Sequence, residues 1–166
     1  LIIEKSSALV PTSAWIWNTK TKILTPFIEQ KYGLLATWFA DHGFALVFNT
    51  VESRTFEFAF LYTKTGRRVS LPFITLPEKC AVTGEQPVLY CGVPVEIPAN
   101  VALPDDYLTR QWYSQDRLIA VHLNELRVVE LTDDSTGLFD IYKPTVIEKN
   151  LFFTNRRDGK VYKIRV

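Results

Sequence analysis

A hairpin that occurs twice constrains the fold of this chain more than any other feature. The first copy is Ala14–Phe27 (AWIWNTKTKILTPF) and the second is Phe56–Phe73 (FEFAFLYTKTGRRVSLPF). Each copy runs from an apolar and aromatic strand into Thr-Lys-Thr, continues into a second strand and ends at Pro-Phe. Thr19 and Thr63 occupy the same place in the two copies and lie 44 residues apart. A hairpin that recurs at such an interval is typical of a repeat architecture built from small sheets.

A second type of hairpin alternates with the first. Trp38–Phe48 turns at Asp-His-Gly between two arms that are nearly all apolar, as expected of strands covered on both faces. Its place is taken 42 residues later by the hairpin from Cys80 to Cys91. Turn signals at regular spacing, with no convincing helical period, predict an all-β chain.

These hairpins divide the chain into four predicted units within one region, 1–166. They are a partial unit at 1–28, a unit at 33–75, a unit at 77–132 with an insertion at 92–116, and a three-strand unit at 139–166. The insertion departs from the repeat and has four prolines near or within it. The total is roughly fourteen strands, which is about 3.5 of the four-stranded blades of a β-propeller. We therefore expect part of a larger propeller.

The only two cysteines lie on either side of a predicted turn. If Thr83 pairs with Val88, antiparallel register places Cys80 opposite Cys91 with both side chains on one face, where a disulfide can form. The alternative is two buried thiols that pack as small hydrophobic groups. A disulfide closing this loop would stabilise the fold by about 3 kcal/mol and would predict a location outside a reducing cytosol.

Charge and hydropathy exclude several classes of protein. The net charge of +1 lacks the basic excess of a nucleic-acid-binding protein, and the 22% of charged residues with 47% hydrophobic residues makes disorder unexpected. No apolar run is long enough to span a membrane. The chain begins at Leu1 and contains no Met, so we expect a processed chain or part of a longer one.

The chain carries no recognisable catalytic or metal-binding pattern. His42 is expected in a turn and His122 on a strand, and neither has further ligands nearby in the sequence. Asp133 and Asp134, near Asp140, lack the spacing of a calcium-binding loop. No nucleophile elbow, phosphate-binding glycine loop or HExxH motif occurs. We therefore expect no metal, no cofactor and no enzymatic activity.

The insertion holds the residues we select as candidates for binding. It combines carboxylates with aromatic side chains: Asp105, Asp106, Tyr107, Trp112 and Tyr113. Insertions in repeat proteins commonly lie on the binding face. One alternative is a surface loop whose Pro-Asp-Asp makes a turn while the aromatic rings seal a sheet edge. Another is a sugar site, in which Asp105 or Asp106 would act with Asp116 on a glycosidic bond.

The hairpin at Trp38–Phe48 resembles the first hairpin of a TolB-like β-propeller blade, although Ala40 and His42 depart from the family pattern. The C-terminal half is also similar to uncharacterised exported propeller proteins of bacteria, through LPEKC ending at Cys80, LYC ending at Cys91 and LFFTN ending at Asn155. The resemblance covers most of the chain and rests on structural motifs. It implies a propeller fold and carries over no catalytic residue.

Together these features predict a non-catalytic propeller scaffold or binding module of the cell envelope that presents loops to a protein or polymer partner. Its expected location is extracytoplasmic, in the periplasm, at the cell surface or secreted, and it is compatible with a membrane anchor upstream of Leu1. The alternatives are a carbohydrate-active propeller that uses the carboxylates of the insertion, or an immunity protein that inhibits a toxin.

Overall fold

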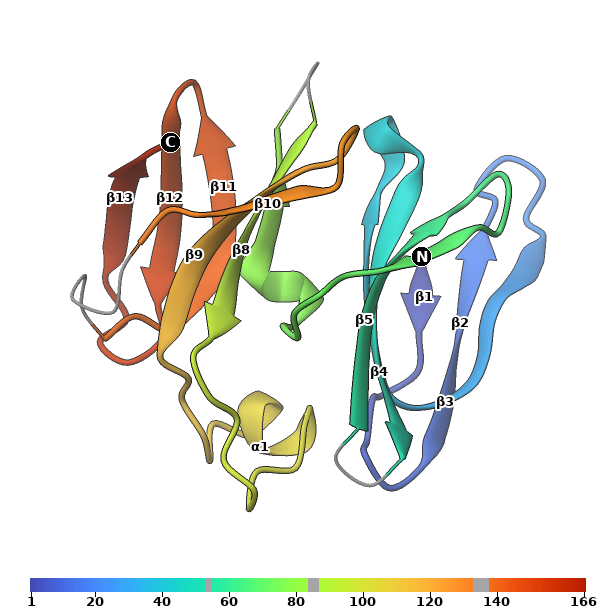
Figure 1. The fold of residues 1–166 in the computed structure, drawn as a ribbon. Coiled ribbons are helices and arrows are strands. Elements are labelled where there is room, and N and C mark those ends of the chain that lie inside the picture. The colour runs from blue at the N-terminus through green and yellow to red at the C-terminus, as the bar shows by residue number, and fades with distance from the viewer. Residues whose placement is uncertain (53–54, 84–86, 133–137) are drawn as a thin grey trace. The chain divides into compact units, whose positions relative to one another are not determined.

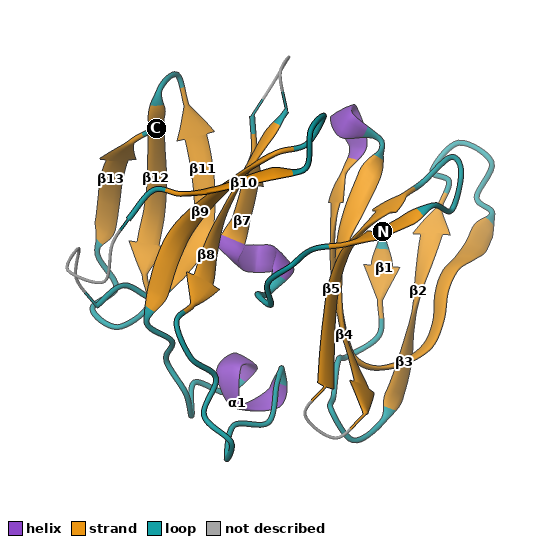
Figure 2. Ribbon diagram, in the orientation of Figure 1, coloured by secondary structure: helices purple, strands orange, loops and turns teal. Residues whose placement is uncertain are grey.

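The regular secondary structure of the chain is almost entirely antiparallel β-strand, joined by loops (Figures 1 and 2). This computed structural model describes every residue except 53–54, 84–86 and 133–137. In the described part the helical elements are short: α1 (Asp105–Leu108) and two single turns of 3-10 helix, η1 (Ala40–His42) and η2 (Pro77–Lys79). The prediction of an all-β chain is confirmed.

The strands of the described residues form three separate sheets. The first has six strands in the order β1-β2-β3-β4-β5-β6, the second has four in the order β10-β9-β8-β7, and the third has three in the order β11-β12-β13. Neighbouring strands are antiparallel throughout. The bounds are β1 Ile2–Ile3, β2 Pro11–Trp17, β3 Leu24–Phe39, β4 Phe44–Glu52, β5 Thr55–Tyr62, β6 Arg68–Ser70, β7 Cys80–Val82, β8 Val88–Pro94, β9 Asp116–His122, β10 Arg127–Glu130, β11 Ile141–Ile147, β12 Asn150–Asn155 and β13 Val161–Arg165.

These sheets belong to two compact units. Unit 1 comprises Leu1–Pro72 and Ala99–Trp112 and so holds the six-stranded sheet and α1. Unit 2 comprises Phe73–Pro98 and Tyr113–Val166 and holds the other two sheets. The sequence predicts one region with an insertion at 92–116, but β8 and β9 use both ends of that stretch, and its middle belongs to unit 1. No closed propeller is found among the described residues.

One long strand differs from the expected division of the N-terminal half. The sequence separates 1–28 from 33–75, whereas β3 runs without a break through the residues between them and pairs with β2 and then with β4. Gln30 and Gly33 have φ values of 51° and 61°, and the pairing register shifts on both sides of Tyr32. Such irregularities bend a strand while its pairing continues. The described residues therefore hold thirteen strands instead of the expected fourteen.

The core of unit 1 is apolar and rich in aromatic rings. β4 is buried on both faces from Phe44 to Asn49, as its continuous apolar run predicts. The rings of Phe44 and Phe60 meet edge to face with centroids 5.0 Å apart. Other fully buried side chains of this unit are Leu34, Leu46, Phe48, Phe58, Leu103 and Tyr107.

Unit 2 contains the disulfide. Cys80 on β7 lies opposite Cys91 on β8, with a Cα–Cα separation of 4.2 Å, and their sulfurs are bonded. The register follows from the turn, where the N–H of Thr83 donates to the carbonyl of Val88 at 3.0 Å. The predicted bridge is confirmed, and the alternative of two separate thiols is excluded.

The two sheets of unit 2 pack on each other through β11, which contacts β7, β8 and η2. Ile141 of β11 joins Leu118 and Phe153 in the buried cluster between the sheets. Tyr162 of β13 covers one side of this cluster, with its ring stacked on Phe153 at 5.8 Å. The three-stranded sheet thus depends on the four-stranded sheet for its core.

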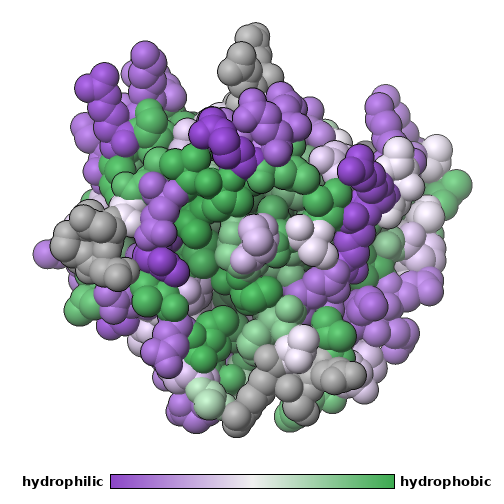
Figure 3. Space-filling view, in the orientation of Figure 1, coloured by the Kyte–Doolittle hydropathy of each residue, from purple (hydrophilic) through white to green (hydrophobic). Residues whose placement is uncertain are grey.

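Among the described residues, no helix has the length and apolar character needed to cross a membrane. The face drawn in Figure 3 carries hydrophobic residues among hydrophilic ones. Several large apolar side chains are well exposed, including Leu9 at 84% and Val10 at 58%. Exposed apolar side chains that line a common hollow are candidates for a binding surface.

Candidate functional site

Helix α1 lies in the insertion and begins with two of the predicted site residues, Asp105 and Asp106. Acidic residues in the first turn suit the partial positive charge of a helix N-terminus. The Asp106 carboxylate also accepts a 2.7 Å hydrogen bond from the main-chain N–H of Ala102. Thr109 then ends the helix, and its hydroxyl donates to the carbonyl of Asp105 at 2.8 Å. The Pro-Asp-Asp segment is therefore a short helix instead of the simple turn weighed from the sequence.

The three aromatic candidates have different environments. Tyr107 is fully buried, and its ring meets Trp112 edge to face with centroids 6.4 Å apart. Both residues belong to unit 1. Tyr113 belongs to unit 2, where the Arg156 guanidinium lies 5.5 Å from the centre of its ring. Tyr107 thus serves packing and is not available as a contact surface, whereas Trp112 and Tyr113 are half-buried.

The Asp105 carboxylate fixes the N-terminal segment against α1. It accepts hydrogen bonds from the Ser7 hydroxyl at 3.3 Å and from the main-chain N–H of Ala8 at 3.1 Å. On the other side, the N–H of Gly33 donates to the Ser7 carbonyl at 2.7 Å. A Cβ at Gly33 would lie 2.6 Å from the Thr50 hydroxyl oxygen, so glycine permits the close approach. Residues almost a hundred positions apart are thereby joined.

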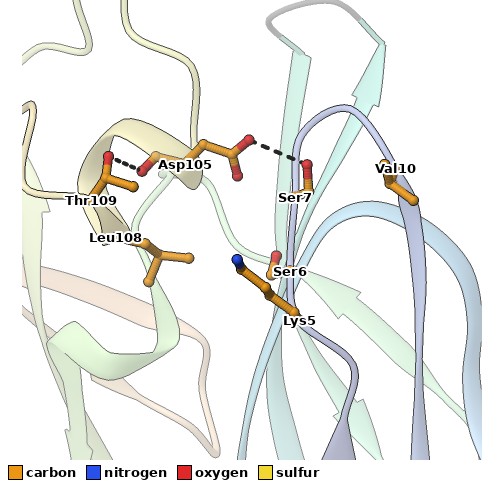
Figure 4. A pocket seen from close by; sticks show the side chains of 7 residues that line it. All are labelled: Lys5, Ser6, Ser7, Val10, Asp105, Leu108 and Thr109. Atoms are coloured by element: carbon orange, nitrogen blue, oxygen red, sulfur yellow. Dashed lines mark hydrogen bonds between the residues drawn. The ribbon is translucent and has the colours of Figure 1, made fainter.

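A pocket of about 510 Å³ opens between this N-terminal segment and α1, within unit 1 (Figure 4). Its apolar walls include Val10 and Leu108, which are 58% and 43% exposed. Lys5, which is exposed, extends from the N-terminal segment toward Leu108 in Figure 4. The remaining lining residues are Ser6, Ser7, Asp105 and Thr109. The buried Ser6 hydroxyl has no hydrogen-bond partner among the described residues.

The chemistry of this pocket suits binding better than catalysis. Its one carboxylate, Asp105, is occupied by the hydrogen bonds that hold the N-terminal segment. Lys5 supplies a positive charge beside an apolar surface, and Ser6 supplies a hydroxyl. Few polar groups on a largely apolar concave wall are typical of a ligand or peptide site. Of the five predicted residues, only Asp105 lines the pocket.

Unit 2 holds a buried cluster of charges that the sequence did not reveal. Lys79 is 0% exposed, and its ammonium lies 2.6 Å from the Asp116 carboxylate and 2.5 Å from that of Asp140. The Ser114 hydroxyl accepts a further hydrogen bond from Lys79 at 2.7 Å, and the N–H of Ile141 donates to Asp116 at 2.7 Å. A buried charge is stable in a fold only when it is paired and hydrogen-bonded in this way.

Burial dominates the electrostatics of this cluster. It raises the pKa of the Asp116 carboxyl, and the nearby Lys79 ammonium opposes that rise. Burial also raises the pKa of Glu78, against the attraction of Arg156 and Lys79. The cluster links η2 to the starts of β9 and β11, so it fixes the two sheets of unit 2 to each other. Since its charges are enclosed and mutually paired, we assign it a structural role.

This cluster also bears on the glycosidase hypothesis. Asp116 lies within the core of unit 2 at 6% exposure, bound to Lys79. Asp105 and Asp106 accept main-chain hydrogen bonds within unit 1. A glycosidase needs one free carboxyl to protonate the leaving group and another to attack or to activate water. The three carboxylates are therefore engaged in contacts that hold the fold, and this arrangement does not support a catalytic pair.

None of the remaining polar candidates that the structure describes lines the pocket. His42 lies in η1 with its ring 6.1 Å from that of Phe44, and His122 ends β9. Asp133 and Asp134 fall outside the described residues, and Asp140 belongs to the buried cluster. The described residues hold no group of three or more His, Cys, Asp or Glu side chains that could bind a metal ion.

The sequence could not reveal Lys5, Ser6 or Leu108 as neighbours. They come from segments about a hundred residues apart, and none belongs to a motif. The apolar pair Leu9-Val10 stands in a polar stretch of the sequence, and of these two residues Val10 lines the pocket. No family model and no curated protein matches this chain.

Proposed function

We propose that this chain is a non-catalytic binding module that captures an extended segment of a partner protein in the pocket between its N-terminal segment and α1. The observation that carries this proposal is the exposure of Val10 and Leu108 on the walls of one hollow of about 510 Å³. An apolar side chain of the partner would fill the hollow, and an acidic group beside it would pair with Lys5.

The scaffold we propose is part of a β-propeller. Four consecutive antiparallel strands, β7 to β10, pair in chain order, as one propeller blade requires. β3 to β6 also pair in chain order, and β11 to β13 would be a blade with three of its strands. In such an architecture the insertion between β8 and β9 is a loop suited to partner binding. The Cys80–Cys91 disulfide supports an extracytoplasmic setting, at the cell envelope or outside the cell.

A library of displayed random peptides, selected on the immobilised chain, tests the pocket directly. We expect the selected peptides to share an apolar residue beside an acidic one. Leu108→Asp and Val10→Asp should each weaken their binding by about tenfold or more, because a buried leucine side chain contributes about 1.5–3 kcal/mol.

The matched control is Leu126→Asp, which changes a leucine of nearly equal exposure, 44% against 43% for Leu108, in unit 2. It should leave binding unchanged. Selected peptides whose affinity is indifferent to both pocket substitutions would overturn the site. A different result would indicate a polymer partner in place of a protein: no peptide is selected, and the chain binds envelope polysaccharide in a way that Leu108→Asp abolishes.

A further inference from the structure

The outer edge of β13 in unit 2 has an open row of main-chain groups. β13 is the last strand of its sheet, which has three strands in the order β11-β12-β13. Its pairing with β12 is regular from Thr154 opposite Val161 to Asn150 opposite Arg165. Among the described residues no strand pairs with its other side.

The hydrogen bonds at the two ends of β13 identify which groups are open. The N–H of Asn155 donates to the carbonyl of Lys160, and the N–H of Val166 donates to the carbonyl of Lys149, both at 2.9 Å. In an antiparallel pair, bonded and non-bonded positions alternate. Lys160, Tyr162, Ile164 and Val166 therefore direct their main-chain groups toward β12, and the main-chain groups of Val161, Lys163 and Arg165 point outward.

The side chains of β13 divide in the same alternation. Val161, Lys163 and Arg165 are exposed, whereas Tyr162 and Ile164 are half-buried against the core of unit 2. In a further strand beside β13, every second side chain would lie on the same face as Tyr162 and Ile164, which are only partly covered. The side chains between them would lie on the face of Lys163 and Arg165. This pattern defines what can bind.

The charges argue against a second copy of the same strand. Antiparallel pairing of two β13 strands over their whole length through the open groups would place Lys163 opposite Lys163, and a shift by one hydrogen-bonded pair toward the C-terminus would place Lys163 opposite Arg165. Like charges directly opposite each other in a sheet are destabilising. Lys149 and Lys160 add exposed positive charge near the two ends of the strand. The nearby negative charges are Glu148 and Asp158, and the Asp158 carboxylate accepts a 2.6 Å hydrogen bond from the Tyr162 hydroxyl.

We propose that the edge of β13 is a second protein-binding site, which takes an extended acidic segment of a partner protein by adding it to the sheet as a fourth strand. Acidic residues two positions apart in the segment lie opposite Lys163 and Arg165. The residue between them is apolar and covers Ile164. Main-chain hydrogen bonds supply the affinity, and the alternate side chains supply the specificity. This site is independent of the pocket in unit 1.

A synthetic peptide of about ten residues that alternates glutamate with valine is the probe, and amide hydrogen exchange is the first readout. The peptide should slow exchange at the amides of Val161, Lys163 and Arg165, which are open in the free chain. The amides of Tyr162 and Ile164, which already bond to β12, should change little. This alternation distinguishes strand addition from general electrostatic attraction.

Affinity measurements on variants complete the test. Lys163→Glu should weaken the peptide by about fivefold or more, since it replaces a favourable cross-strand pair with a repulsive one. Lys64→Glu, which changes an exposed lysine in a turn of unit 1, should have no effect. A peptide with lysine in place of glutamate should bind more weakly than the acidic peptide.

Three results would overturn the proposal. Equal binding of the lysine and glutamate peptides would remove charge recognition, and unprotected amides at the three open positions would remove strand addition. If the wild-type chain forms a dimer and Lys163→Glu disrupts it, the edge of β13 binds a second copy of this chain instead of an acidic partner. Failure of this site leaves the pocket untested, because Leu108→Asp and Lys163→Glu probe different units.

Discussion

The two units bury their interiors by different means. The largest fully buried side chains of unit 1 are aromatic or aliphatic, such as Phe48 and Phe58. Among these side chains, Tyr107 carries a hydroxyl. Unit 2 encloses a lysine, two aspartates and a disulfide among its apolar residues. Both units are built from antiparallel sheets, so secondary structure does not account for the difference.

The contrast shows what each unit depends on. Apolar packing is insensitive to pH and to redox conditions, whereas a buried ion pair responds to pH and a disulfide responds to reducing agents. Unit 2 joins two sheets, and the Lys79 cluster lies where η2, β9 and β11 meet. We therefore expect changes of condition to act on unit 2 first.

The largest effect should come from Lys79→Ala. It leaves Asp116 and Asp140 buried without their shared ammonium partner, and loss of one partner from a buried pair costs about 3–5 kcal/mol. Urea denaturation should give this loss in the free energy of unfolding. Hydrogen exchange should show faster opening of amides in unit 2 with those of β4 and β5 in unit 1 little changed.

Two controls sharpen that result. Lys64→Ala removes an exposed lysine and should change the free energy of unfolding by less than about 0.5 kcal/mol. Leu46→Ala makes a cavity in the core of unit 1, at a cost of about 3 kcal/mol, and should open unit 1 instead. A Lys79→Ala variant as stable as the wild type would refute the structural role of the cluster.

Removal of the disulfide should have the next largest effect. The double variant Cys80→Ala with Cys91→Ala loses the cross-link between β7 and β8, which the chain-entropy relation values at about 3 kcal/mol for a loop of this length. Thermal unfolding with and without reductant measures it. Reductant should destabilise the wild type and leave the double variant unchanged. Equal stability of the reduced and oxidised wild type would contradict the prediction.

The smallest effect concerns pH and Glu78. Burial raises the pKa of this carboxyl above its ordinary value of 4.5, so the folded chain holds the proton more tightly than the unfolded chain. Its contribution to stability is therefore complete below the ordinary pKa and is lost as the pH rises through the raised value. Glu78→Gln cannot lose a proton, so it should be more stable than the wild type near neutral pH.

Urea denaturation at several pH values checks this prediction. The advantage of Glu78→Gln over the wild type should grow from acidic to neutral pH. Parallel curves for Glu78→Gln and the wild type would show that the buried environment of Glu78 does not influence stability.

Local sequence patterns predicted much of the fold. The repeated Thr-Lys-Thr hairpin and the apolar arms of Trp38–Phe48 gave the antiparallel strands, because alternation and turn residues act over a few positions. The register across the turn at Thr83 gave the disulfide. The continuity of β3 was missed, since Gly33 marks a bend as readily as a break.

The candidate site was predicted only in part. The sequence directed attention to the insertion, and Asp105 does line the pocket. Tyr107 was predicted as a binding residue but is fully buried in unit 1, because an aromatic ring in a loop can equally fill a core. The burial of Lys79 was not predicted, because a lysine is normally solvated and its carboxylate partners lie 37 and 61 residues away in the sequence.

The sequence by itself determined most of the strands, their hairpins and the Cys80–Cys91 bridge, since each depends on residues close together in the chain. Tertiary structure alone decided that the N-terminal segment meets α1 and that Lys79 meets Asp116 and Asp140. Such contacts join distant segments, and they form only when burial of apolar surface outweighs the cost of closing long loops. No local pattern encodes that balance.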